Sequence, residues 1–361
     1  MEENTAKNKN TKELIIEHCL KYPKLQITDV FKYLHQSSFG CEHLAPSEKN
    51  VANYIKDEYS ALNGTYSDTV ERLDGAYSRV FLSCLDDGVT PETLGKLFCR
   101  SARHEPNGEK ELLGKITAVR ELIDEGRLPF SSEEFVKALD NWSKKGYPAV
   151  HHSDVFRSEY SPSYRVISNE YVVFLPIFSK IDRALSIGKT IIAIEGGSAS
   201  GKTTLAKMLE DIYGCTVFHM DDFFLRPEQR TPERFAEAGG NVDRERFLSE
   251  VLKPYSEGKT VLYKRFDCGT QTLCEPIPVT PQPLTVVEGA YSMHPVLSPY
   301  YTFSVFLDID QQYQRERINK RNTPQLAKRF FNEWIPLEHK YFSEMNIKEK
   351  CTLTVSVKKY V

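Results

Sequence analysis

A glycine-rich segment near the middle of the chain carries residue types that suit phosphate binding. Residues 196–203 read Gly-Gly-Ser-Ala-Ser-Gly-Lys-Thr, which fits the pattern G-x-x-x-x-G-K-[ST]. Glycines let the backbone curl so that successive N–H groups point at phosphate oxygens, and a following helix adds its positive N-terminal end. An apolar strand pattern before the segment and a helical pattern after it (Leu205, Met208, Leu209) favour this interpretation over a glycine-rich turn without a ligand.

The residues that close this motif suit a nucleotide and its metal ion. Lys202 brings a mobile positive charge to the β- and γ-phosphates. The Thr203 hydroxyl is able to ligate Mg²⁺. We therefore predict ATP and Mg²⁺ as cofactors. The predicted ATP-binding residues are Gly196, Gly197, Ser198, Ala199, Ser200, Gly201, Lys202, Thr203 and Thr204.

Two acidic residues follow apolar segments where a ligand crevice is expected. Asp221 comes directly after the strand expected at 216–220, and a carboxylate at the carboxyl end of such a strand is suited to accept the proton of an attacking hydroxyl. Glu288 ends the apolar segment 284–287, the expected place for a carboxylate that orients Mg²⁺. We predict Thr203 and Glu288 as metal ligands, partly through water. The plainer interpretations are a capping loop aspartate and an ordinary strand end.

A basic cluster follows the strand expected to end at Phe306–Asp310. It contains Arg315, Arg317, Lys320 and Arg321. On a helix, residues 317 and 321 share one face, so two guanidinium groups could clamp the charge of phosphoryl transfer. The alternative is a solvated basic face. The predicted catalytic residues are Lys202, Asp221, Arg317 and Arg321.

The second half of the chain alternates between β-branched apolar segments and helical patterns. Such alternation indicates an α/β fold, with a parallel sheet covered on both faces. We assign residues 190–361 to this domain. The expected strands are Thr190–Glu195, Thr216–Met220, Val261–Tyr263, Leu284–Val287, Ser304–Leu307 and Leu353–Val357.

Together these motifs resemble those of the uridine kinase family, which is close to phosphoribulokinase. The segment GGSASGKTT matches the sequence of that family's phosphate-binding loop, and Asp221–Phe224 matches the family's Asp-x-Phe-[Tyr/Phe] segment. The resemblance runs from about Ile191 to Thr354. Further similar segments are Asn241-Val242-Asp243, Glu257–Val261, Phe266-Asp267, Glu288-Gly289 and Phe306–Asp310.

The resemblance implies a P-loop kinase with a five-stranded parallel sheet, similar in fold to the nucleoside monophosphate kinases. By this likeness Asp221 would be the general base, Asp243 would hold sugar hydroxyls and Arg321 would contact the transferring phosphate. The predicted substrate-binding residues are Asp221, Phe224, Asp243 and Phe266.

The sequence departs from the family where the acceptor would bind. Phe224 and Phe266 stand where the family has aromatic hydroxyls near the nucleobase, so they can stack but cannot hydrogen-bond. The segment Asn322–Gln325 lacks the family's Arg-Asp ending and long basic lid. Because a site of bare aromatics discriminates weakly, we predict an altered or broader acceptor, a nucleoside or a sugar-like polyol.

The first half of the chain has mostly helical patterns and is assigned to a helical domain at 11–147. Apolar residues recur at helical spacing between Leu112 and Ile123, for example. We expect residues 1–10 to form a disordered tail. Residues 148–189 are expected to connect the domains and to contain short strands, with the apolar run Tyr171–Phe178 forming a hairpin or an irregular segment.

Metal-type side chains gather at His35, Cys41 and His43, which raises the hypothesis of a zinc or other metal site. The alternative is a helix turn with satisfied polar residues. Cys268 and Cys274 are also close together, but no second pair of ligands accompanies them. This half could otherwise act as a sensory or substrate-gating module.

Composition sets the remaining expectations. The 361 residues are 40% hydrophobic and 27% charged, with a formal net charge of −3, which argues against nucleic-acid or membrane partners. No apolar run approaches the roughly 20 residues of a membrane span. The polar first residues lack the apolar core of a signal peptide. We therefore expect a cytoplasmic location and a small-molecule partner, and the oligomeric state stays open.

The leading prediction is an ATP-dependent kinase that transfers the γ-phosphate to a hydroxyl of a small molecule. The alternative is a regulatory protein in which ATP binding controls the N-terminal domain. A third reading is a pseudo-kinase scaffold, and the intact Lys202, Thr203 and Asp221 argue against it.

Overall fold

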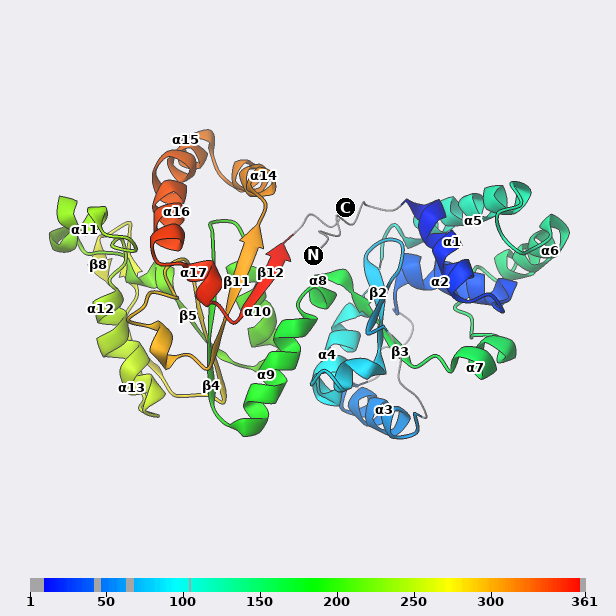
Figure 1. Cartoon of the computed structure of the whole chain (residues 1–361), viewed down its shortest axis with the longest axis horizontal. Helices are drawn as coiled ribbons and strands as arrows, with labels where there is room; N and C mark the ends of the chain where they lie inside the picture. Colours follow the sequence, from blue (N-terminus) through cyan, green and yellow to red (C-terminus); the bar gives the residue numbers. More distant parts are fainter. Residues whose placement is uncertain (1–9, 42–46, 63–67, 104, 358–361) are drawn as a thin grey trace. The chain divides into compact units, whose positions relative to one another are not determined.

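The computed structural model describes residues 10–41, 47–62, 68–103 and 105–357. Its contacts divide the chain into two units, with the boundary between Ser179 and Lys180. Figure 1 labels the helices and strands of both units in chain order.

Several helices of the N-terminal unit begin at a residue whose side chain accepts a hydrogen bond from the first helical turn. The side chain of Asn10 accepts one from the backbone N–H of Glu13, and the side chain of Ser131 accepts one from the backbone N–H of Glu134. The helices are α1 (Thr11–Lys21), α2 (Ile27–Phe39), α3 (Glu48–Ser60), α4 (Pro91–Ser101), α5 (Gly108–Asp124), α6 (Ser132–Ser143), α7 (Asp154–Tyr160) and α8 (Asn169–Val172), with a short 3-10 turn at Leu82–Leu85.

A three-stranded antiparallel sheet also belongs to this unit. Its order is β1 (Val70–Arg72), β2 (Tyr77–Phe81) and β3 (Tyr164–Ser168). The strands β1 and β2 were not expected from the sequence. The reason is that every residue of β2 is buried, including Arg79, so the strand has no alternation of apolar and polar residues.

The expectation of a hairpin or irregular segment at Tyr171–Phe178 is wrong. Tyr171 and Val172 end α8, residues 173–174 form a turn, and α9 (Leu175–Ile187) begins directly after it. Leu175 and Phe178 are both buried and lie one helical turn apart, so a helix buries them on one face.

The C-terminal unit is built on a five-stranded parallel sheet. Five parallel strands are what the family resemblance implied, and their order is β12-β11-β4-β10-β5. The central strands are rich in Val and Ile and almost wholly buried, which is typical of a sheet covered on both faces. The strands are β4 (Thr190–Gly196), β5 (Thr216–His219), β10 (Leu284–Glu288), β11 (Phe303–Ile309) and β12 (Leu353–Val357).

Helices surround this sheet and extend beyond its carboxyl edge. Helix α10 contacts β4, β5 and β10. Figure 1 shows α14, α15 and α16 arching beyond the arrowhead of β11. The helices are α10 (Lys202–Tyr213), α11 (Pro232–Ala236), α12 (Arg244–Arg246), α13 (Lys253–Ser256), α14 (Gln311–Arg321), α15 (Pro324–Arg329), α16 (Ile335–Glu344) and α17 (Ile347–Lys350), with π-helical turns at Phe247–Leu252 and Phe330–Trp334.

One predicted strand lies outside the parallel sheet. The strand β6 (Val261–Tyr263) pairs antiparallel with β9 (Ile277–Val279). Within that hairpin, β7 (Phe266–Asp267) pairs with β8 (Thr272–Leu273). Val261 and Tyr263 are buried against the main core, whereas Leu262 is exposed, so this strand has only one covered face.

None of the helices in the described part of the chain is both long enough and apolar enough to cross a membrane.

A glycine allows the carboxyl ends of β10 and β5 to lie close together. Gly289 follows β10 with φ +138°, and its backbone N–H donates to the Ile194 carbonyl at 3.1 Å. A Cβ added at Gly289 would lie 2.7 Å from the Cβ of Met220, at the start of the turn that carries Asp221. The close approach of these two strand ends therefore depends on glycine.

We expect Gly289→Ala to lower the free energy of unfolding by about 1–3 kcal/mol, because the new methyl group overlaps Met220 and the backbone angle becomes strained. Urea unfolding measures this change. Gly188→Ala is the matched control, since a Cβ there would meet nothing within 4 Å. Equal stability of the two variants would contradict the close packing at Gly289.

Candidate active site

The predicted phosphate-binding segment forms the loop between β4 and α10, in the strand–loop–helix context that the motif requires. Gly196, Ala199 and Gly201 have φ of +147°, +62° and +100°. A Cβ on Gly196 would lie 2.6 Å from the Leu307 carbonyl oxygen, so only glycine fits there. The positive φ angles curl the backbone at three points along the loop, which is the geometry that turns amides inward around an anion.

Lys202, the first residue of α10, folds back over this loop. Its Nζ donates hydrogen bonds to the carbonyls of Gly196 and Gly197, at 2.9 and 3.0 Å. The ammonium is therefore held at the loop by neutral carbonyls rather than by a carboxylate. A phosphate group would offer it a stronger, charged acceptor.

The predicted metal-binding pair is in contact. The Thr203 hydroxyl donates to Glu288 Oε1 at 3.1 Å, and Glu288 is buried at the end of β10. A hydroxyl and a carboxylate side by side next to a phosphate-binding loop are the oxygen ligands that Mg²⁺ prefers. The residues present therefore fit the ion, with the phosphates and water completing its shell.

His219 joins this pair and was not predicted. Its Nδ1 lies 2.7 Å from Glu288 Oε1, and this hydrogen bond raises the pKa of His219. The two residues face each other in the register of β5 and β10. The signal was in the sequence, because His219 immediately precedes the Met-Asp-Asp segment at the expected carboxyl end of its strand.

Asp221 lies in the 3-10 turn that follows β5, with its side chain open to solvent. Desolvation by the surrounding protein raises its pKa, and Lys202 opposes that rise, while Glu288 adds to it. The charges of Lys202 and Glu288 therefore both affect the pKa of Asp221. A raised pKa makes the carboxylate a better proton acceptor.

The two predicted arginines of α14 face the same region. A Cβ built on Gly201 would lie 3.7 Å from Arg317 Nη1, which puts this guanidinium beside the loop. Desolvation and Arg317 lower the pKa of Arg321, whereas Asp221 and Glu338 act to raise it. All three arginines of the cluster lie over aromatic rings: Arg315 over Phe331, Arg317 over Tyr313 and Arg321 over Phe330, with 4.5, 5.4 and 5.6 Å to the ring centroids.

Residues that hold the loop were missed by the sequence analysis. Glu338 of α16 accepts hydrogen bonds from the Ser198 backbone N–H at 2.9 Å and from the Ser198 hydroxyl at 2.6 Å. Gln314 of α14 donates to the Ser198 carbonyl at 2.8 Å. Both side chains are buried. They join α14 and α16 to the loop across more than a hundred residues of sequence, so no local pattern reveals them.

A buried carboxyl group braces the strand that leads into the loop. Glu195 accepts hydrogen bonds from the backbone N–H groups of Gly196 and Met293, at 2.9 and 3.0 Å, and from the Tyr341 hydroxyl at 3.1 Å. Complete burial raises the pKa of Glu195 to about 7, although the two amides act to lower it. The group ties the end of β4 to the β10–β11 connection and to α16.

Asp243, predicted to bind the acceptor, is tied to the turn that carries Asp221. Its backbone N–H donates to the Phe223 carbonyl at 2.7 Å, and its side chain accepts from the Arg246 backbone N–H at 3.2 Å. The second carboxylate oxygen, Oδ2, accepts no hydrogen bond from any residue that the structure describes. Arg246 Nε and Arg226 Nε lie 3.6 and 3.8 Å from it. Asp243 therefore has capacity for a hydroxyl donor.

The two predicted acceptor aromatics differ in exposure. Phe224 is half-buried and forms a β-bridge with Val242, which brings it beside Asp243. Phe266 is buried, and the Arg230 guanidinium lies 5.8 Å from its ring centroid. One face of Phe266 is therefore covered by a cation, and Phe224 is the ring more open to a ligand.

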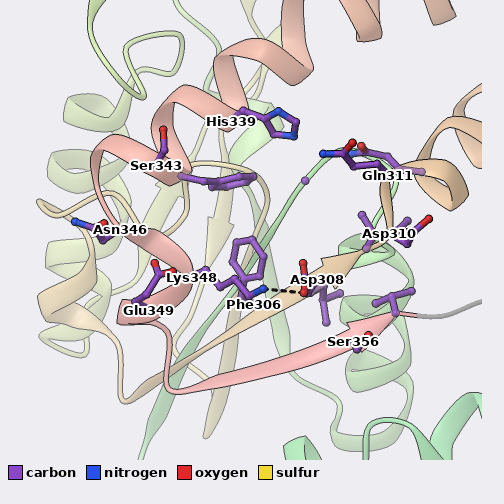
Figure 2. Close-up of a pocket in the computed structure, with 16 residues that line it drawn as sticks. Phe306, Asp308, Asp310, Gln311, His339, Ser343, Asn346, Lys348, Glu349 and Ser356 are labelled. Carbon is purple, nitrogen blue, oxygen red and sulfur yellow. Dashed lines mark hydrogen bonds and ion pairs between the residues drawn. The ribbon is translucent and has the colours of Figure 1, made fainter. Parts of the chain in front are cut away.

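A cavity of about 910 Å³ adjoins the loop (Figure 2). Gly197 lines it, together with the carboxyl ends of β11 and β12 and one side of α16 and α17. Phe306 and Phe342 form an edge-to-face pair in its wall, with ring centroids 5.2 Å apart. An ion pair between Lys348 and Asp308, with Nζ and Oδ2 2.8 Å apart, lies at its side. The volume is within the range of small-molecule sites.

The metal hypotheses for the cysteine and histidine residues gain no support from the geometry. Cys41 Sγ lies 3.4 Å from the Val166 carbonyl oxygen, and burial raises the pKa of this thiol to about 12. His43 lies outside the described residues. Over the ranges 10–41, 47–62, 68–103 and 105–357, no three His, Cys, Asp or Glu side chains lie together in a way that could hold a metal ion. Cys268 and Cys274 are therefore not part of such a group among the described residues.

Comparisons with solved structures give P-loop kinases. A possible uridine kinase from Bacillus stearothermophilus is 20% identical, with 49% of this chain and 98% of that chain covered and a TM-score of 0.37. A proposed fructose transport system kinase from a Silicibacter species is also 20% identical, with 46% and 89% covered and a TM-score of 0.38. Shikimate kinase from Bacteroides thetaiotaomicron is 14% identical, with 46% and 86% covered and a TM-score of 0.26. At this level of identity the likeness concerns the fold alone.

Sequence comparisons identify fewer similar proteins than the structure comparisons do. No protein-family model matches the chain. A curated relative, the tRNA-specific adenosine deaminase subunit tad2 of Schizosaccharomyces pombe, is 31% identical over 139 residues. That match covers 37% of this chain, and the chain spans only 33% of the length of that protein.

Proposed function

We propose that the C-terminal unit is an ATP-dependent phosphotransferase that passes the γ-phosphate to a hydroxyl of a small molecule. One observation carries the proposal. The curled loop with Lys202 at its end lies at the same edge of the sheet as the Thr203–Glu288 contact and the solvent-open Asp221. A phosphate site, a metal-ligand pair and a proton acceptor are the parts that phosphoryl transfer requires.

The nucleotide would bind with its phosphates in the loop and its base in the adjoining cavity. Backbone N–H groups of the loop that do not already donate within the protein, as Ser198 does to Glu338 and Ser200 to the Gly197 carbonyl, would surround the phosphates together with the start of α10. Gly197 belongs both to the loop and to the wall of the 910 Å³ cavity, so one ligand can reach both. Thr203 and Glu288 would hold Mg²⁺, which neutralises phosphate charge when it is bound.

Transfer would take place between the loop and Asp221. The Asp221 carboxylate would accept the proton of the acceptor hydroxyl as that oxygen attacks the γ-phosphorus in line with the leaving oxygen. Lys202, Arg317 and Arg321 would stabilise the negative charge on the transferring group. The charge of Asp221 acts to raise the pKa of Arg321, which supports a position of both side chains near the transferring phosphate.

The acceptor would lie between Phe224 and Asp243. Asp243 Oδ2 accepts no hydrogen bond from the described residues, although Arg226 and Arg246 lie within ion-pair distance, so it would accept one from a hydroxyl. The half-buried ring of Phe224 suits a flat or apolar surface. Neither Phe224 nor Phe266 offers a hydroxyl group that could recognise a base edge. This supports a nucleoside or sugar-like polyol held mainly by its hydroxyls, with discrimination between bases weaker than in the uridine kinase family.

Asp221→Asn is expected to lower the rate of phosphoryl transfer by about 10²–10⁴-fold, because the amide cannot accept the proton, while ATP binding stays unchanged. Product formation from ATP and an accepted hydroxyl compound measures the rate. Asp222→Asn is the matched control, because its amide oxygen can still accept the hydrogen bond from the Tyr263 hydroxyl. Equal activity of Asp221→Asn and the unaltered protein would remove Asp221 from the role of base.

A panel of nucleosides and small polyols, each supplied with Mg-ATP, tests the acceptor class. We expect at least one other compound to be phosphorylated as readily as uridine, because the aromatic residues cannot read a base edge. Phosphorylation of uridine far above every other compound would contradict the altered specificity. Slow ATP hydrolysis with no phosphorylated product from any member would favour a nucleotide-dependent regulator instead.

A further inference from the structure

The N-terminal unit holds a cavity of about 280 Å³ that has no part in the proposed phosphoryl transfer. It lies between α2, β3 and the segment before α7, with single residues of α3 and α4 closing it. Its volume is close to the lower end of the range for small-molecule sites and equals roughly nine water molecules of liquid volume.

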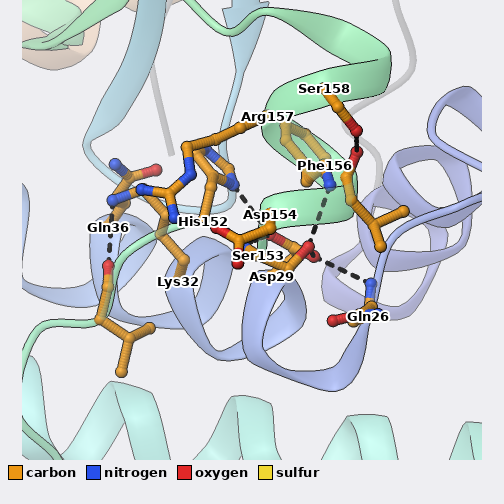
Figure 3. A network of polar contacts seen from close by, with 12 residues as sticks. Gln26, Asp29, Lys32, Gln36, His152, Ser153, Asp154, Phe156, Arg157 and Ser158 are labelled. Carbon is orange, nitrogen blue, oxygen red and sulfur yellow. Dashed lines mark hydrogen bonds and ion pairs between the residues drawn. The ribbon is translucent and has the colours of Figure 1, made fainter.

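One wall of this cavity is a fixed chain of polar side chains that begins at Asp29. Asp29 is fully buried and accepts hydrogen bonds from the Gln26 backbone N–H, from the Ser153 backbone and hydroxyl groups, and from His152 Nδ1 (Figure 3). Burial acts to raise the pKa of Asp29, but these hydrogen bonds hold it at about 2. The carboxylate is therefore ionised, and it fixes the orientation of His152.

The chain continues from His152 into the cavity. Because ionised Asp29 only accepts, Nδ1 of His152 carries the proton, which leaves Nε2 to accept from the Tyr164 hydroxyl at 2.6 Å. Burial lowers the pKa of His152 to about 4, so the ring is neutral near pH 7. Tyr164 in turn accepts from Gln36 Nε2 at 3.3 Å. His152, Tyr164 and Gln36 all line the cavity.

A buried guanidinium fixes the far end of this wall. Gln36 Oε1 accepts from Arg79 Nε and Nη2 at 3.0 and 2.8 Å, and Arg79 Nη1 pairs with Glu71 Oε2 at 3.2 Å. Arg79 is 0% exposed. Burying such charges adds little or nothing to stability compared with apolar packing, so a network of this kind around a cavity suggests a binding role.

The charged residues that line the cavity indicate the charge of the ligand. Lys32 Nζ donates to the Val150 carbonyl at 3.0 Å, and no carboxylate of a described residue lies within ion-pair distance of it. Glu58, the carboxylate among the lining residues, pairs with Arg165 at 2.8 Å. The lining thus has two cations and one anion. Desolvation lowers the pKa of Lys32 to about 8, so most of it still carries its charge near pH 7.

We propose that this cavity binds a small organic carboxylate, with its charged group on Lys32 and its other polar groups on the wall formed by His152, Tyr164 and Gln36. One ammonium with no anionic partner among the described residues matches a single negative charge better than the double charge of a phosphate. An ammonium has three donors, and the bond to Val150 uses one, so two remain for the ligand. The site would give the N-terminal unit a ligand of its own.

The test is the rate at which acetic anhydride acylates Lys32 in the protein, followed by peptide mass spectrometry, with the monocarboxylate lactate as the probe. We expect lactate to slow acylation of Lys32 about tenfold at a concentration about ten times its dissociation constant. Lys24 is the internal control, because it is exposed and already paired with Glu159 at 2.8 Å. Protection by inorganic phosphate but not by lactate would overturn the carboxylate assignment, and no protection by either would overturn the site.

A variant gives an independent measurement. Because the phosphate-binding loop also attracts anions, the melting temperature is measured in the Lys202→Ala background. Lactate is expected to raise it by a few degrees, and Lys32→Gln, but not Lys24→Gln, is expected to abolish the rise. An equal rise in all three proteins would contradict binding at Lys32. If Lys32→Gln fails to fold, the acylation rates of the unaltered protein decide alone.

Discussion

The curl of residues 196–201 constrains the rest of the C-terminal unit. A backbone with three positive φ angles, at Gly196, Ala199 and Gly201, suits the binding of an anion by its N–H groups. Such a segment persists only when its surroundings fix it. Here Glu195 holds the strand before the loop, α10 begins directly after it, and Glu338 with Gln314 holds Ser198.

The charged groups around the loop are arranged by the parallel sheet. His219 and Glu288 end adjacent strands in register, and Asp221 follows the first of them within a turn. Parallel strands deliver their carboxyl ends to one edge, so residues distant in sequence meet there. The arginines of α14 approach from beyond β11. The site is thus assembled from strand ends, where the backbone is rigid, and from one helix that follows the sheet.

Local sequence patterns were enough to predict where in the fold the loop and the acidic residues lie. The loop needs glycines at fixed spacing, and the acids lie directly after apolar strands, so both could be predicted. The five-stranded sheet followed from the family resemblance. Glu338 and Gln314 could not be predicted, because their partner Ser198 lies more than a hundred residues away. His219 was overlooked although its position at a strand end was visible.

The N-terminal unit shows where such reasoning fails. Its strand β2 is buried on both faces and includes Arg79, so no periodicity distinguishes it. The pairing of His152 with Asp29 joins residues 123 positions apart. The histidine and cysteine residues that drew attention in the sequence at 35 and 41 do not form a metal cluster with other described residues, whereas a polar wall around Tyr164 was not anticipated.

The central claim is that the loop binds a nucleotide through its phosphates, and the most direct measurement is calorimetric titration of Mg-ATP into the protein and into its Lys202→Ala variant. Lys207→Ala, on the exposed side of the same helix where Lys207 pairs with Glu210 and Asp211, serves as the reference. The account predicts that Lys202→Ala weakens binding by at least about tenfold, or ~1.4 kcal/mol, while Lys207→Ala binds as the unaltered protein does. Absence of ATP binding to the unaltered protein, or equal affinity in all three, would contradict it.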